Sequence, residues 1–179
     1  MNIRLILILF LFQIGTASII IDKCEKNINT TFSQYDSLKH TIWNIPSNIK
    51  YQIEGKTKQR FFKDNIHIWK IYKNESQIGT AILDNVLGKS MPISFLVIFN
   101  IYGDIIKTEI IKYREHYGGE ISSRNWLNQF ENFNDTSFYN VGNGIDGISG
   151  ATISVNSITK GIHKLALLFS IINLKTIEE

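Results

Sequence analysis

Four segments in the middle of the chain are rich in Ile, Val, Phe and other large apolar residues and are separated by short polar turns. This pattern predicts strands. The segment Ile93–Ile101 is almost continuously apolar, which indicates an interior strand that is covered on both faces. Because the turns are short, we expect consecutive strands to pair as an antiparallel meander. The expected strands are Asn65–Tyr72, Ile78–Val86, Ile93–Ile101 and Ile105–Tyr113.

Apolar residues at steps of three and four predict helices elsewhere. We expect them over Ser33–Trp43, over Ile121–Phe130 and from Ser154 onward. The last of these has one apolar stripe, made of Ile158, Ile162, Leu165, Phe169 and Ile172. The charged segment Lys50–Lys63 fits a short strand or a loop. Strands followed by separate helices predict an α+β fold, with an antiparallel meander sheet of about four or more strands and helices packed on it.

The first residues have the layout of a secretory signal. Arg4 precedes the apolar run Leu5–Ile14, and the small residues Gly15–Ala17 follow. We therefore expect a signal peptide over residues 1–17, cut after Ala17, and a protein exported to the periplasm or the outer face of the cytoplasmic membrane. The alternative is an uncleaved membrane anchor, because Ser18–Ile21 extends the apolar run. After this segment we expect an N-terminal helix and extension over residues 18–60 and the main domain over residues 61–179.

Composition excludes several classes of protein. With 179 residues and a formal net charge of +3, the chain has no basic stripe that would indicate nucleic acid binding. Its single cysteine, Cys24, cannot form an internal disulfide. The spacing of His, Cys and carboxylate residues gives no metal site and no catalytic triad, so we expect neither a bound metal nor catalytic residues of a hydrolase.

The stretch Asp146–Ser154 carries the candidate chemistry. It lies where the last predicted helix begins, and backbone N–H groups at a helix start have no helical partner and favour an anion. Gly150 and Ala151 are small enough for a phosphate to approach the main chain, and Thr152 offers a hydroxyl that could be esterified. The alternative is that Ser149 and Thr152 only cap the helix.

This stretch resembles the flavin-attachment motif Asp-x-x-Ser/Thr-Gly-Ala-Ser/Thr of the covalent FMN-binding domain family. That family includes flavin-carrying domains of the sodium-pumping NADH:quinone reductase and of the Rnf electron-transport complex. The resemblance implies that residues 61–179 form an FMN-binding domain and that Thr152 carries FMN through a phosphoester. It further implies that the residues around Thr152 bind the phosphate or position the motif, namely Asp146, Ser149, Gly150, Ala151 and Ser154.

A second motif of the family, Glu-x-x-Gly, is matched by Glu115 and Gly118. The resemblance implies that this bend lies against the flavin. His116 and Tyr117 stand where a Thr-Pro type pair is more usual, which changes the contacts that the bend can make. Arg124 follows on the next predicted helix and is a candidate to reach the ring or the phosphate.

The resemblance implies an exported electron carrier with covalent FMN, more than a stand-alone enzyme. Its partners would be an FAD-dependent flavin transferase that installs the FMN, and membrane-associated redox proteins that donate and accept electrons. Two other hypotheses remain open at this point. One is a flavin-dependent reductase of a small substrate, and the other is a non-redox module that binds an anion at the helix start.

Overall fold

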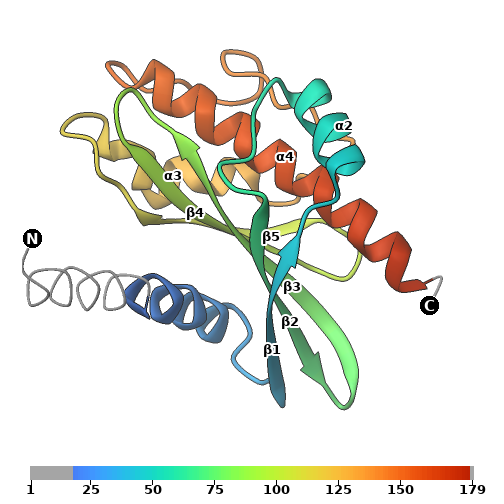
Figure 1. Cartoon of the computed structure of the whole chain (residues 1–179). Coiled ribbons are helices and arrows are strands. Elements are labelled where there is room, and N and C mark those ends of the chain that lie inside the picture. The colour runs from blue at the N-terminus through green and yellow to red at the C-terminus, as the bar shows by residue number, and fades with distance from the viewer. Residues whose placement is uncertain (1–17, 178–179) are drawn as a thin grey trace, which may run out of the picture.

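The structure is a computed structural model that describes residues 18–177. A five-stranded antiparallel sheet lies at its centre (Figure 1). The strand order is β1-β2-β3-β4-β5, so each strand pairs with its neighbours in sequence. The predicted α+β meander is therefore confirmed. The signal peptide expected over residues 1–17 lies outside the described residues. The strands are β1 (Ser37–Asn44), β2 (Asn65–Lys73), β3 (Ser76–Leu87), β4 (Pro92–Phe99) and β5 (Ile105–Lys112).

Helices cover both faces of this sheet. The long C-terminal helix α4 (Thr152–Ile177) and α2 (Ser47–Thr57) lie on one face, while the helix over residues 18–31 lies on the other (Figure 1). Residues Ile93–Phe99 of β4 are all buried, as expected for a strand covered on both faces. The side chains of β4 therefore divide between two cores.

The larger core lies beneath α4. Ile158, Ile162 and Leu165 are fully buried there, so the predicted apolar stripe is confirmed. The smaller core lies beneath the helix over residues 18–31, where Cys24 and Ile28 are fully buried against the sheet. Burial and the neighbouring Glu25 carboxylate raise the pKa of Cys24 to about 12, which makes the thiol unreactive at neutral pH.

The predicted helix over Ser33–Trp43 is wrong, because Ser37–Asn44 forms the edge strand β1. The segment has few large apolar residues to define a period, mainly Leu38, Ile42 and Trp43, and β2 provides hydrogen bonds that an isolated segment lacks. The prediction for Lys50–Lys63 is also wrong over its first half, which belongs to α2. The helical signal was present there, since Ile49, Ile53 and Thr57 are buried at steps of four.

The predicted helix over Ile121–Phe130 is broken into three short turns. They are η1 (Gly119–Ser122), α3 (Arg124–Leu127) and η2 (Asn128–Phe130). The Ser123 hydroxyl oxygen caps α3 by accepting the Trp126 N–H at 3.4 Å. The side chains of Trp126, Leu127 and Phe130 are all buried and so point inward.

The expected boundary at residue 60 separates elements that contact each other. β1 pairs along its whole length with β2, and α2 packs beside α4. Lys164 of α4 also donates a hydrogen bond to the Arg60 carbonyl at 2.8 Å. Residues before and after position 60 thus share one sheet and one core.

Candidate flavin site

Thr152 is the first residue of α4, and its side chain is exposed. The helical ladder begins with the bond from Val155 N–H to the Ala151 carbonyl at 2.9 Å. The N–H groups of residues 152–154 therefore precede the first helical bond and have no partner within the helix. A hydroxyl and three main-chain donors thus come together at one exposed helix start.

The turn before Thr152 is tight and depends on a glycine. Gly150 has φ +77°, a left-handed conformation that glycine adopts without a steric penalty, and the space around it is open. The Ala151 N–H donates to the Ile148 carbonyl at 3.1 Å, which closes the turn. Ala151 is buried, whereas Ser149 faces solvent. The buried Ala151 therefore holds the motif against the core, and Thr152 remains exposed to solvent.

Asp146 is held by its main chain. Its carbonyl accepts the indole N–H of Trp126 at 2.7 Å, and its N–H donates to the side-chain oxygen of Gln129 at 2.7 Å. Trp126 is 5% exposed, so it belongs to the core, as the residue type favours. α3 and η2 thereby fix the point at which the chain enters the motif.

The bend that contains Glu115 and Gly118 lies directly against the motif. Gly118 has φ +78°, and a Cβ at this position would lie 2.7 Å from the Cβ of Ala151. Such a distance is too short for two carbon atoms, so only glycine allows this approach. The Tyr113 hydroxyl donates to the Tyr117 carbonyl at 2.5 Å and holds the bend in place. The structure thus joins the two motifs that the sequence singled out.

Glu115 binds the neighbouring loop. Its Oε1 atom accepts the N–H groups of Ser90 and Met91 at 2.7 and 3.0 Å. These bonds to the ionised form hold the pKa of Glu115 below its ordinary value. Gly88 leaves room for the carboxylate, because a Cβ there would lie 2.6 Å from Oε1. Glu115 therefore shapes the wall of the site by fixing the β3–β4 loop.

These three segments surround an open pocket of about 540 Å³. The loop between β3 and β4, the bend after β5 and the start of α4 meet at one end of the sheet (Figure 1). A pocket of this size is in the range that small ligands and cofactors occupy. The lining residues are Lys89, Ser90, Glu115, His116, Tyr117, Gly150, Ala151, Thr152, Ile153 and Ser154.

Seven of the eleven predicted contact residues line this pocket, and Gly118 touches Ala151 beside it. Asp146, Ser149 and Arg124 are not among the lining residues. Sequence reasoning missed Lys89, Ser90 and Ile153. Topology could have found the first two, because in a meander the loop before one strand lies at the same end of the sheet as the exit of the next strand.

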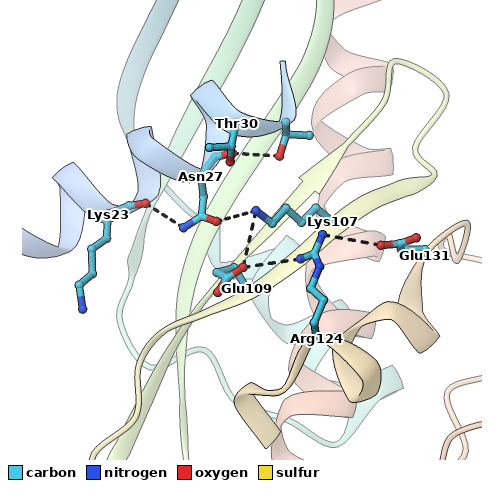
Figure 2. A network of polar contacts seen from close by, with 8 residues as sticks. Lys23, Asn27, Thr30, Lys107, Glu109, Arg124 and Glu131 are labelled. Carbon is cyan, nitrogen blue, oxygen red and sulfur yellow. Dashed lines mark hydrogen bonds and ion pairs between the residues drawn. The ribbon is translucent and has the colours of Figure 1, made fainter. Parts of the chain in front are cut away.

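Arg124 instead belongs to a polar network at the β5 edge of the sheet. Figure 2 shows its guanidinium between Glu109 and Glu131, at 3.6 and 4.0 Å. Lys107 approaches the same Glu109 carboxylate at 3.6 Å and donates to the Asn27 side chain at 2.7 Å. This network links α3, β5 and the helix over residues 18–31 (Figure 2). In the structure Arg124 is thus placed to hold α3 against β5.

Comparison with known families agrees with this site. Residues 88–166 match the model of a family described as the FMN-binding domain. The matched range begins at the β3–β4 loop, includes the bend and the Asp146–Ser154 stretch, and ends within α4. All ten lining residues lie within it. Comparison with curated proteins gave no match.

The residues present fit an FMN molecule. The pocket has the volume for a flat ring, its lining residues Gly150 and Ala151 have no bulky side chains, and the helix start offers N–H donors to a phosphate. Within residues 18–177, no helix is both long and apolar enough to cross a membrane. The same described part of the chain contains no group of three His, Cys, Asp or Glu side chains arranged to hold a metal ion.

Proposed function

We propose that this protein is an exported electron carrier whose FMN is attached to Thr152 through a phosphoester. The observation that carries the proposal is the exposed Thr152 hydroxyl at the start of α4, on the wall of the pocket that the flavin-binding family match covers. When bound, FMN supplies reversible uptake of electrons. The protein supplies the tether, the phosphate contacts and the walls around the ring.

The phosphate would lie at the helix start. The N–H groups of Ile153 and Ser154 point out of the first turn, and the helix dipole favours negative charge there. Ser154 is buried and lines the pocket, so its hydroxyl is available as a further donor on the protein side. The Asn156 amide is already used, because it donates to the Thr152 carbonyl at 2.8 Å.

Attachment requires a separate flavin transferase. In that step the Thr152 oxygen attacks the FMN phosphorus of FAD, the bond between the two phosphates breaks, AMP leaves, and a base takes up the hydroxyl proton. No electrons are exchanged. Exposure of Thr152 on an open pocket supports this role, because the transferase must reach the hydroxyl. Thr152 is therefore a modification site and is not a catalytic nucleophile of this protein.

We further propose that the protein works on the outer side of the cytoplasmic membrane or in the periplasm, with membrane-associated redox proteins as electron donor and acceptor. The apolar run before Ala17 supports export. A covalent bond is useful in that location, since a tethered cofactor cannot be lost where FMN is not resupplied. The open pocket also leaves the ring accessible to a partner protein.

The test is the intact mass of the full chain after coexpression with a flavin transferase. We expect a mass increase of one FMN less one water, and we expect Thr152→Ala to abolish it. Ser149→Ala is the matched control, because Ser149 carries an exposed hydroxyl three residues earlier and does not line the pocket. An unmodified wild-type chain, or a mass increase that survives Thr152→Ala, contradicts the proposal.

A further inference from the structure

Tyr117 has an unusual place at the pocket. Its side chain is 84% exposed, yet it is one of the residues that line the cavity beside Thr152. Within residues 18–177, the structure gives its hydroxyl no hydrogen-bond partner. A single exposed aromatic residue is common on protein surfaces, so exposure alone means little. The Tyr117 ring is notable because the backbone on either side of it is held in place.

That backbone is fixed on both sides of the ring. The Tyr117 carbonyl accepts the Tyr113 hydroxyl at 2.5 Å, and the next residue, Gly118, lies against Ala151 with a left-handed φ of +78°. The Cα atom of Tyr117 is therefore held next to the helix start, and only two side-chain torsions remain free. A tyrosine in this state loses little conformational entropy when it packs against a ligand.

A second apolar side chain completes the surface. Ile153 is 52% exposed and also lines the pocket, one residue after the proposed attachment point. Tyr117 and Ile153 come from different segments, the bend after β5 and the first turn of α4. Two exposed apolar groups beside one tether provide a surface for a flat, largely apolar ring.

We infer that the Tyr117 phenol ring stacks on the isoalloxazine ring and holds the tethered flavin against the protein. The inference rests on the proposed attachment of FMN to Thr152. Aromatic rings prefer offset stacking or edge-to-face contact, and such a pair shifts an equilibrium by roughly two- to tenfold. Without Tyr117 the phosphoester and the ribityl chain would let the ring move in solvent. Tyr117 is thus a positioning residue of the cofactor.

The test is the fluorescence anisotropy and yield of the attached flavin in the flavinylated full chain. A docked ring tumbles with the protein, and an electron-rich phenol in contact quenches flavin emission. We expect Tyr117→Ala to lower the anisotropy and to raise the emission, with a roughly two- to tenfold shift from docked to free ring. Tyr117→Phe should keep most of the anisotropy and lose part of the quenching, because it keeps the ring and removes the electron-donating hydroxyl.

Tyr102→Ala is the matched control. Tyr102 is 82% exposed, but it lies in the β4–β5 turn at the opposite end of β4 from the pocket. We expect it to leave both signals unchanged. Each preparation is checked by intact mass and by thermal unfolding, since removal of an exposed ring should leave the fold intact.

The outcomes separate the two proposals. Flavin attached to Tyr117→Ala with wild-type anisotropy and emission overturns the stacking role and leaves the attachment in place. A Tyr102→Ala variant that changes as much as Tyr117→Ala also overturns it. Absence of attached flavin from every preparation overturns the proposed function, and the present inference falls with it.

Discussion

The first turn of α4 and its middle have opposite environments. Thr152 lies open to solvent on a pocket wall, whereas Lys164, three turns further along, is fully buried. Its ammonium group lies 2.7 Å from Asp84 of β3, donates to the Arg60 carbonyl and lies 4.4 Å from the centre of the Phe61 ring. The middle of α4 is thus held in the core, while its first turn is exposed at the pocket.

The first prediction removes that anchor. Lys164→Ala should lower the free energy of unfolding by about 3–5 kcal/mol, because it leaves the Asp84 carboxylate buried without its cation. Apart from this ion pair, Asp84 Oδ2 has no hydrogen-bond partner among the described residues. Urea unfolding monitored by tryptophan fluorescence gives the value. The double variant Lys164→Met with Asp84→Leu should recover most of the loss, and a double variant as unstable as the single one would contradict this explanation.

The second prediction alters the contact between the bend and the start of α4. Gly118→Ala should destabilise the protein by about 1–3 kcal/mol, since it combines a left-handed backbone with a side-chain clash. The neighbouring Gly119 is the matched control, because a Cβ there meets no atom within 4 Å. Gly119→Ala should be close to neutral in thermal unfolding. Equal effects of the two variants would show that the approach of Gly118 to Ala151 is not the cause.

The third prediction concerns His163, the residue before Lys164 in the middle of α4. His163 stacks on Tyr139 with ring centroids 4.4 Å apart, and burial lowers its pKa, with Asp135 opposing and Lys56 adding to the effect. A lowered pKa in the folded state means that the neutral ring is favoured. Its contribution to stability is complete above the ordinary pKa and is lost as the pH falls through the folded value.

We therefore expect unfolding free energies to decrease between about pH 7.5 and pH 5, and we expect His163→Gln to make that decrease smaller. Urea unfolding at a series of pH values measures both. A His163→Gln variant with the same pH dependence as the wild type would exclude His163 as its source.

The smallest expected effect concerns the charge of the pocket. Lys89 lines it, and the Glu115 carboxylate is engaged with main-chain N–H groups. Within residues 18–177 the structure gives the Lys89 ammonium group no carboxylate partner, so its charge would stabilise a reduced, anionic flavin in the pocket. Removing one exposed charge by Lys89→Gln should lower the reduction potential of the attached flavin by about 5–20 mV, given about 0.2–1 kcal/mol for such an interaction in a two-electron couple. Spectroelectrochemical titration measures the shift. A potential that is unchanged or higher would contradict this role.

The sequence predicted some elements of the fold better than others. The strands from Asn65 onward and the stripe of α4 were predictable, because each has a clear period and a buried face. β1 and α2 were misassigned, since few apolar residues lie in each and the pairing partner decides between helix and strand. The break of Ile121–Phe130 into short turns follows from its contacts with β5 and with Asp146, which local propensity does not contain.

The candidate site, too, could be predicted from the sequence only in part. The motif around Thr152 and the Glu115–Gly118 bend were recognisable as patterns, but their contact through Gly118 and Ala151 is a property of the fold. The charge of Arg124 and its nearness in sequence indicate a contact with the cofactor, but in the structure its guanidinium pairs with Glu109 and Glu131. No local sequence pattern indicates Lys89, because it lies in a connecting loop of mixed composition.

The most direct test of the central claim locates the FMN on the chain. Peptide mass spectrometry of protein coexpressed with a flavin transferase should find the FMN phosphate on the residue 152 side chain. Thr152→Ser keeps a hydroxyl and should remain flavinylated, whereas Thr152→Val keeps the shape, lacks the hydroxyl and should carry none. Flavin on another residue, or an equally flavinylated Thr152→Val variant, would contradict the account.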